Sequence, residues 1–279
     1  MKSSLSQVLA WAESRGCAVG AFNTPAYECV RGVLAAAEHL GTPVILSHAQ
    51  LHEPEAPLEE IGPLMLWAAE RSKVPTCVFL DHGETTEYVK RAIDLGFNAV
   101  MFDGSLSPYE TNVAGTKDVV AYAHERGVQV EAEIGSLAQR EGGENGASAA
   151  VYTDPELARR FVADTGIDAL AASFGTAHGI YKTKPKLDFE RIRRIRELTG
   201  LPLVMHGGSG VSPEDYREAI ACGVRKINYY SYMGRAGANA AREALALPET
   251  TFFHTASASA TAAMEADAAK AMAVFMGHP

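Results

Sequence analysis

Residues 76–82 read TCVFLDH, a short β-rich run that ends in an aspartate and a histidine. Its apolar residues are consecutive rather than alternating, which predicts a strand buried on both faces, as in a parallel sheet covered by helices. Such a strand could end in valine as readily as in Asp81 and His82. We therefore expect this polar pair to belong to a functional site at the carboxyl end of the strand.

Seven further runs of this kind alternate with helical periodicity along the 279-residue chain. Eight strands, each followed by a helix, predict an α/β fold: a closed (β/α)8 TIM barrel forming a single domain over residues 1–279. An open doubly wound sheet is the alternative, although no GxGxxG motif follows the first run. The Ala- and Met-rich stretch 254–276 predicts an additional C-terminal helix that packs on the barrel or on a neighbouring subunit. The other expected strands are 18–22, 43–49, 99–105, 128–135, 168–175, 202–208 and 226–231, and the expected helices include 26–40, 84–95, 109–126, 154–165, 188–199 and 213–221.

Composition excludes several classes of protein. The net charge is −9 and no Lys/Arg-rich run is present, which argues against a nucleic-acid-binding surface. No stretch approaches the roughly 20 apolar residues that span a bilayer. The four cysteines are scattered and form no CxxC pair, which indicates reduced thiols and a cytoplasmic protein.

Polar residues recur at the ends of the expected strands, on the face where barrel active sites are built. Three histidines from different strands match the three-nitrogen pattern of catalytic zinc. A histidine taken alone is more often a hydrogen-bonded structural residue, and we expect that role for His39, His52, His124, His254 and His278, while His48 stays open. The strand-end residues are Asp81, His82, Asp103, Glu131, Glu133, His178 and His206.

Glycine-rich segments suggest two further parts of a site. HGGSG (206–210) and KINYYS (226–231) predict a phosphate site after strands seven and eight, where Asn228 and Ser231 could donate hydrogen bonds. The segment SLAQREGGENGASAAVY (136–152) predicts a mobile active-site lid, with a simple surface loop as the alternative.

These motifs together resemble one known family. FLDHG, MFDGS, VEAEIG, FGTAHGIY, HGGSG and KIN occur in the order and spacing of the class II, metal-dependent fructose-/tagatose-bisphosphate aldolases, from residue 21 to residue 231. The resemblance implies a lyase of carbohydrate metabolism that reversibly cleaves a ketose phosphate to dihydroxyacetone phosphate and an aldehyde through a metal-stabilised enediolate.

The resemblance also implies roles for individual residues. His82, His178 and His206 would bind Zn²⁺, or another divalent metal such as cobalt or iron, and Asp103 and Glu133 would mark a second metal position. Asp81 would exchange the proton of the aldehyde-derived oxygen, and Glu141 the proton on the nucleophilic carbon. A monovalent cation would lie near the phosphate. The implied substrate- and phosphate-binding residues are Asn23, Gly179, Gly207, Gly208, Ser209, Asn228 and Ser231.

The sequence departs from the family pattern near the expected aldehyde. Ala49, Tyr229 and Tyr230 replace the expected residue types, and the lid reads AQREGG (138–143). We therefore expect an acceptor other than simply glyceraldehyde 3-phosphate, with Arg140 or Arg235 as candidate partners of a second anion. A sugar-phosphate epimerase or isomerase and a non-catalytic partner subunit remain alternatives, and we expect a homodimer or homotetramer.

Overall fold

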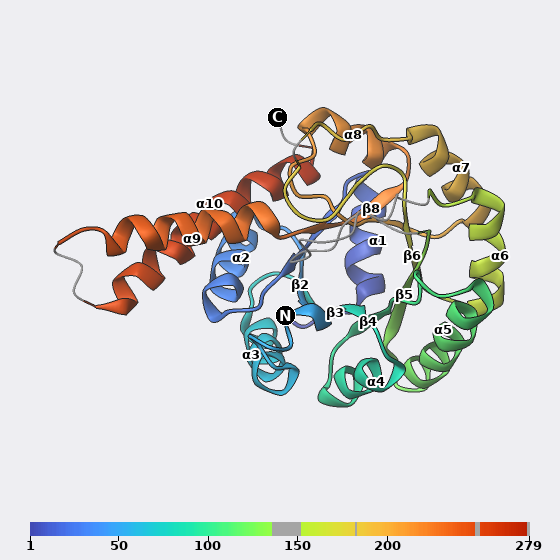
Figure 1. The fold of residues 1–279 in the computed structure, drawn as a ribbon, viewed down its shortest axis with the longest axis horizontal. Coiled ribbons are helices and arrows are strands. Elements are labelled where there is room, and N and C mark those ends of the chain that lie inside the picture. Colours follow the sequence, from blue (N-terminus) through green and yellow to red (C-terminus); the bar gives the residue numbers. More distant parts are fainter. Residues whose placement is uncertain (136–151, 182, 249–251, 278–279) are drawn as a thin grey trace.

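The computed structural model describes residues 1–135, 152–181, 183–248 and 252–277. Eight parallel strands, hydrogen-bonded in sequence order, close into a barrel, with β8 pairing back onto β1 (Figure 1). The TIM-barrel prediction is confirmed, and the open-sheet alternative is wrong. The strands are β1 (Val19–Asn23), β2 (Val44–Ala49), β3 (Thr76–Gly83), β4 (Ala99–Phe102), β5 (Gln129–Ile134), β6 (Ala169–Ala172), β7 (Leu203–Met205) and β8 (Val224–Tyr229).

Helices surround the barrel and correspond to the predicted segments (Figure 1). Two begin with a side-chain cap followed by proline: the side chains of Asp154 and Ser212 accept hydrogen bonds from the first turns of the helices that begin at Pro155 and Pro213. The described helices are α1 (Leu5–Arg15), α2 (Tyr27–Leu40), α3 (Leu58–Arg71), α4 (Thr86–Leu95), α5 (Tyr109–His124), α6 (Pro155–Thr165), α7 (Phe189–Thr199), α8 (Pro213–Ala221), α9 (Ser231–Leu245) and α10 (Phe253–Phe275), with a short 3-10 helix, η1 (Gln50–His52).

Three strands end three residues earlier than the apolar runs that predict them. The runs 99–105, 168–175 and 202–208 extend past the ends of β4, β6 and β7. Their last residues, including Asp103 and His206, lie in the loops that follow these strands. The candidates from these three runs therefore lie beyond the hydrogen-bonded ladder, at the mouth of the barrel, whereas Asp81, His82, Glu131 and Glu133 lie within β3 and β5.

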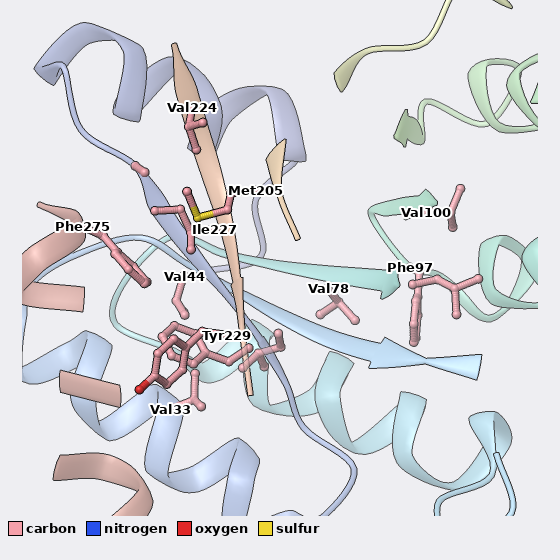
Figure 2. Packing of buried hydrophobic residues seen from close by; sticks show 14 of the residues in the cluster. Val33, Val44, Val78, Phe97, Val100, Met205, Val224, Ile227, Tyr229 and Phe275 are labelled. Atoms are coloured by element: carbon pink, nitrogen blue, oxygen red, sulfur yellow. The ribbon is translucent and has the colours of Figure 1, made fainter. Parts of the chain in front are cut away.

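Buried apolar side chains form an inner and an outer layer. The inner layer fills the barrel with residues such as Ile45, Phe79 and Met101, and α1 contributes Leu5 and Val8 to it. The outer layer lies between strands and helices, where Val33 of α2, Val78 of β3 and Phe275 of α10 belong to one cluster (Figure 2). Burial on both sides of the strands explains their continuous apolar runs.

The predicted C-terminal helix is present as α10. Together with α9 it forms a hairpin that extends away from the barrel in Figure 1, while its other end packs against α2 and α8. Phe275 is buried near Tyr216 and Tyr229, and its carbonyl accepts a hydrogen bond of 3.0 Å from the N–H of Ala18. The last helix thus packs beside the first strand. None of the described helices is both long enough and apolar enough to cross a membrane.

Candidate active site

The end of β3 is irregular, and this irregularity places Asp81 and His82 in one cavity. Successive residues of a regular strand point to opposite faces. Here the pairing with β4 shifts register between Leu80 and Gly83, and His82 has φ 45°, in the left-handed region. Both Asp81 and His82 consequently line the cavity at the barrel mouth. Strained backbone of this kind is typical of functional sites.

The three predicted histidines converge at that cavity. His82 Nε2 lies 2.8 Å from His206 Nδ1, and one ring nitrogen of each of His82, His178 and His206 lies within 4.8 Å of the others. The Nδ1 atom of His178 is buried, and no group in the described part of the chain hydrogen-bonds to it. A divalent metal held by three imidazoles would use such converging nitrogens, so this donor set fits zinc.

Asp103 orients His82. Its carboxylate lies 2.7 Å from His82 Nδ1 and also accepts hydrogen bonds from the N–H and hydroxyl of Ser105. This contact turns Nε2 of His82 toward His206. Burial opposes a charged imidazole, but the charges of Asp81 and Asp103 outweigh it and raise the pKa of His82 to about 10. Glu133 lies with His82 and Asp103 in a group of side chains that could hold a metal ion.

Asp81 is held by two amides. Asn23 Nδ2 donates to one carboxylate oxygen at 3.1 Å and Asn228 Nδ2 to the other at 2.9 Å. Burial tends to raise the pKa of Asp81, but the electrostatic effects of its neighbours, above all His82, outweigh burial and lower it. Asp81 is therefore an oriented carboxylate beside the three histidines. Asn23 and Asn228, predicted to bind substrate, make their described contacts with this carboxylate.

Behind the histidines lies a buried ion pair. Glu131 Oε1 lies 2.8 Å from His206 Nε2, and Lys226 Nζ lies 2.8 Å from Glu131 Oε2 and 3.1 Å from Oε1. The side chains of Glu131 and Lys226 are both 0% exposed. The sequence gives Glu131 no role, and it does not single out Lys226. The sequence around Lys226 carries no signal of burial, because the strand VRKINY also contains Arg225 and Asn228.

The loops after β6 and β7 meet closely. Gly207 has φ 62°, and a Cβ atom there would lie 2.4 Å from the carbonyl oxygen of Ala177. The Tyr181 hydroxyl accepts from the N–H of Ala177 and donates to the carbonyl of Gly207, both at 2.8 Å. Tyr181 therefore ties the loop that carries His178 to the loop that carries His206.

The predicted phosphate-binding residues line the same cavity, with the exception of Gly208. Ser209 Oγ accepts hydrogen bonds from the N–H groups of Tyr230 and Ser231, at 2.9 and 3.1 Å, at the start of α9. Gly208 packs so closely that a Cβ atom would lie 2.7 Å from the carbonyl oxygen of Asn228. The cavity is lined by Asn23, Ala49, Leu51, Asp81, His82, Glu84, His178, Gly179, Gly207, Ser209, Asn228, Tyr229, Tyr230 and Ser231.

The remaining candidates lie elsewhere or outside the described residues. Glu141, Arg140 and most of the predicted lid fall within residues 136–151, which the structure does not describe. Arg235 stacks its guanidinium over the Tyr232 ring, 4.6 Å from its centroid, and is not among the described lining residues. His48, the open case, is fully buried with Nε2 3.0 Å from the Tyr88 hydroxyl, away from the metal-ligating group.

Comparisons with known proteins agree with this geometry. The family described as fructose-bisphosphate aldolase class-II matches residues 3–278. A fructose-bisphosphate aldolase of Giardia intestinalis is 44% identical over 221 residues, covering 77% of this chain and 68% of its own. One from Staphylococcus aureus (strain Mu50 / ATCC 700699) is 40% identical over 254 residues, covering 87% and 85%.

A solved structure is also similar over nearly the full length. The crystal structure of the YdjI aldolase from Escherichia coli K12 superposes with a TM-score of 0.88 at 32% identity and covers 99% of this chain and 97% of its own. These matches favour neither the epimerase alternative nor the non-catalytic one. The converging histidines and the matched family together show that the chain belongs to the class II fructose-bisphosphate aldolase family and is an aldolase.

Proposed function

We propose that this aldolase reversibly cleaves a phosphorylated ketose to dihydroxyacetone phosphate and an aldehyde. The observation that supports this most is the placement of an oriented carboxylate, Asp81, beside three histidines whose ring nitrogens converge. Aldol cleavage needs a base for a hydroxyl proton and an electrophile for the carbonyl, and this site offers the residues for both.

We propose Zn²⁺ as the metal, held by His82, His178 and His206. A bound metal supplies a Lewis acid that stabilises negative charge developing on the carbonyl oxygen of the donor half. Cobalt or iron would also suit three imidazoles. Asp103 and Glu133, adjacent to His82, are candidates for a second metal position.

The proton steps are assigned to two carboxylates. In cleavage, Asp81 takes the proton of the hydroxyl on the carbon that becomes the aldehyde, and the electron pair of the breaking carbon–carbon bond passes to the donor half. The donor carbon then takes up a proton, for which the motif position of Glu141 makes it the candidate. Because the pKa of Asp81 is lowered, its carboxylate is already ionised and can accept the proton at neutral pH.

The phosphate is assigned to the loops after β6, β7 and β8. Gly179 and Gly207 line the cavity and could offer backbone N–H groups to an anion, Gly208 lets the chain pass close to Asn228, to whose carbonyl its N–H donates, and the first turn of α9 adds the positive end of a helix. Ser209 and Ser231 supply hydroxyls in the same wall of the cavity. A monovalent cation beside the phosphate is part of this proposal.

The acceptor end is proposed to admit an aldehyde other than simply glyceraldehyde 3-phosphate. On that side the cavity is lined by Ala49, Leu51 and Tyr230, and the Tyr230 ring stacks edge-on against His52 with centroids 5.3 Å apart. Tyr229 lines the cavity while its hydroxyl bonds to Asp267 of α10 at 2.9 Å. Cleavage rates for a panel of ketose phosphates would contradict this idea if fructose 1,6-bisphosphate were far the best substrate.

We also propose a cytoplasmic homodimer or homotetramer that binds neither nucleic acid nor membranes. Support for the oligomer comes from the far end of the α9–α10 hairpin, where Leu245, Phe252 and Phe253 are 56%, 64% and 76% exposed. Large exposed apolar side chains at one place are typical of protein–protein contacts.

The test begins with the donor half alone. Zinc-loaded protein incubated with dihydroxyacetone phosphate in heavy water should exchange one C–H hydrogen stereospecifically, as seen by NMR, and a chelator should stop the exchange. His206→Ala should abolish exchange and metal binding, whereas His39→Ala, at an exposed position of α2, should leave both unchanged. Release of dihydroxyacetone phosphate from a ketose phosphate then separates an aldolase from an epimerase.

A further inference from the structure

We infer that Glu131 and Lys226 are positioning residues that fix the tautomer of His206, so that its Nδ1 lone pair faces the metal site. This inference deepens the proposed function, because it rests on His206 as a metal ligand. Neither residue lines the cavity, so neither touches substrate. They would act on the metal site only through the imidazole of His206, which lies between them and that site.

The hydrogen-bond geometry of Glu131 defines the direction of His206. A carboxylate can only accept, so the 2.8 Å contact between Glu131 Oε1 and His206 Nε2 requires the proton on Nε2. The other ring nitrogen, Nδ1, is then an acceptor, and it points toward His82 Nε2 at 2.8 Å. Imidazole binds a metal through an unprotonated nitrogen. Glu131 therefore keeps the correct nitrogen available.

Lys226 compensates the negative charge of the buried Glu131 carboxylate. Glu131 and Lys226 are 0% exposed and His206 is 1% exposed. An unpaired charge at such a position would be strongly destabilising. The Lys226 ammonium contacts both carboxylate oxygens, at 2.8 and 3.1 Å, and also lies 4.1 Å from the centre of the Phe79 ring. This double contact holds Glu131 in the place where it meets His206.

The contacts among Glu131, His206 and Lys226 join three strands of the barrel. Glu131 lies on β5, His206 follows β7 and Lys226 lies on β8, so their side chains meet inside the barrel rather than at its surface. Lys226 pairs with Val19 of β1, whose side chain belongs to the inner apolar layer. A buried lysine or glutamate destabilises the fold unless it pairs with an opposite charge. Here the two side chains pair with each other, and Glu131 also contacts His206.

The test is a small set of variants with two readouts. Lys226→Met removes the ammonium at similar length and leaves Glu131 without its counter-ion. In the double variant Glu131→Gln/Lys226→Met, the neutral amide oxygen can accept the His206 N–H without needing a cation. Arg225→Met is the matched control on the same strand, because Arg225 pairs with Glu13 of α1 instead. Thermal unfolding of each variant checks that it is folded.

The first readout is the His206 tautomer in metal-free protein, from ¹⁵N NMR of the labelled imidazoles. Wild type, Arg225→Met and the double variant should carry the proton on Nε2, and Lys226→Met should lose this preference. The second readout is zinc affinity by competition with a chromophoric chelator. We expect a loss of roughly 10- to 100-fold in Lys226→Met, the range typical of outer partners of metal ligands, and recovery of most of it in the double variant.

The outcomes separate this inference from the proposed metal. A proton on Nδ1 in wild type, or a folded Lys226→Met that keeps wild-type zinc affinity, would overturn it. A double variant no better than Lys226→Met would overturn it as well, since charge compensation would then not explain the effect. If wild type bound no zinc yet showed the Nε2 proton and its loss in Lys226→Met, the metal proposal would fail and the positioning of His206 would stand.

Discussion

His82 Nε2 and His206 Nδ1 face each other across 2.8 Å, although the two residues are 124 positions apart in the sequence. Each is aimed by a carboxylate on its far nitrogen, Asp103 for His82 and Glu131 for His206. Imidazoles whose second nitrogens are held in this way are typical of metal ligands. Carboxylates on the far side of the two rings therefore orient the nitrogens that face each other. This arrangement has several consequences that can be measured.

Asp81→Asn should lower kcat without removing the metal. The variant keeps the size of the side chain but loses the base, and general acid–base groups typically contribute roughly 10²- to 10⁴-fold. Steady-state cleavage of a ketose phosphate and metal content by mass spectrometry check this. Asp103→Asn is the contrasting variant, because it acts on the orientation of His82 and should lower metal affinity first. Loss of metal in Asp81→Asn would contradict the assigned role.

Gly207→Ala should abolish activity through steric conflict. The new methyl group would lie 2.4 Å from the Ala177 carbonyl oxygen, and the backbone has φ 62°. Gly41→Ala is the matched control, since Gly41 has φ 64° and no atom within 4 Å of its Cβ position. A left-handed conformation alone costs an L-residue about 1–2 kcal/mol, so the control should lose that much stability and keep its activity. Equal losses in both variants would exclude the steric explanation.

Tyr181→Phe should weaken substrate binding more than it slows chemistry. Removing the hydroxyl breaks two hydrogen bonds of 2.8 Å and loosens the contact between the loops that carry His178 and Gly207. Unsatisfied buried polar groups cost about 1–3 kcal/mol, which corresponds to a rise in KM of roughly tenfold. Tyr109→Phe is the control, because its hydroxyl bonds to Asp164 on the outside of the barrel. An unchanged KM in Tyr181→Phe would show that the bridge is dispensable.

Acid should destabilise the fold partly through His48. Burial lowers the pKa of His48 to about 4, and the nearby His52 adds to this while Glu53 opposes it. An unfolded histidine titrates near 6.5, so between pH 6.5 and 4 the unfolded chain binds a proton that the folded chain excludes. The free energy of unfolding should therefore fall as the pH falls through this window, by about 3 kcal/mol from this residue.

Urea unfolding of metal-free wild type and His48→Gln at several pH values measures that contribution. Glutamine can still donate to the Tyr88 hydroxyl but does not titrate. The stability difference between the two proteins should change between pH 7 and pH 4.5, in the direction that favours the variant in acid. A constant difference would mean that His48 is not protonated on unfolding in this range.

The barrel can be predicted from the sequence because its strands follow a simple pattern. Strands buried on both faces read as continuous apolar runs, and eight of them with intervening helices have one closed arrangement at this length. The three histidines were predictable for the same reason: each lies at or just beyond the carboxyl end of a strand, and those ends share one face of the barrel. Their convergence follows from topology rather than from any local signal.

Two features of the site could not be predicted in this way. Alternation along a strand places Asp81 and His82 on opposite faces, and only the register shift and the positive φ of His82 bring them together. Lys226 follows Arg225 in a strand of mixed polarity, where a lysine is ordinarily interpreted as surface-directed, and its partner Glu131 is 95 residues away. Both depend on long-range pairing that composition and periodicity do not encode.

The contact between α10 and β1 has a consequence for biosynthesis. Phe275 lies in the last turn of the final described helix, yet its carbonyl bonds to Ala18 and a Cβ atom at Gly20 would lie 3.3 Å from its ring. Domains can begin to fold while the ribosome is still extending the chain. This barrel cannot complete the wall around its first strand until residue 275 has been made. Nascent chains should therefore expose the apolar flank of α2 and β1 until α10 emerges from the ribosome, and chaperones would protect that flank in the meantime.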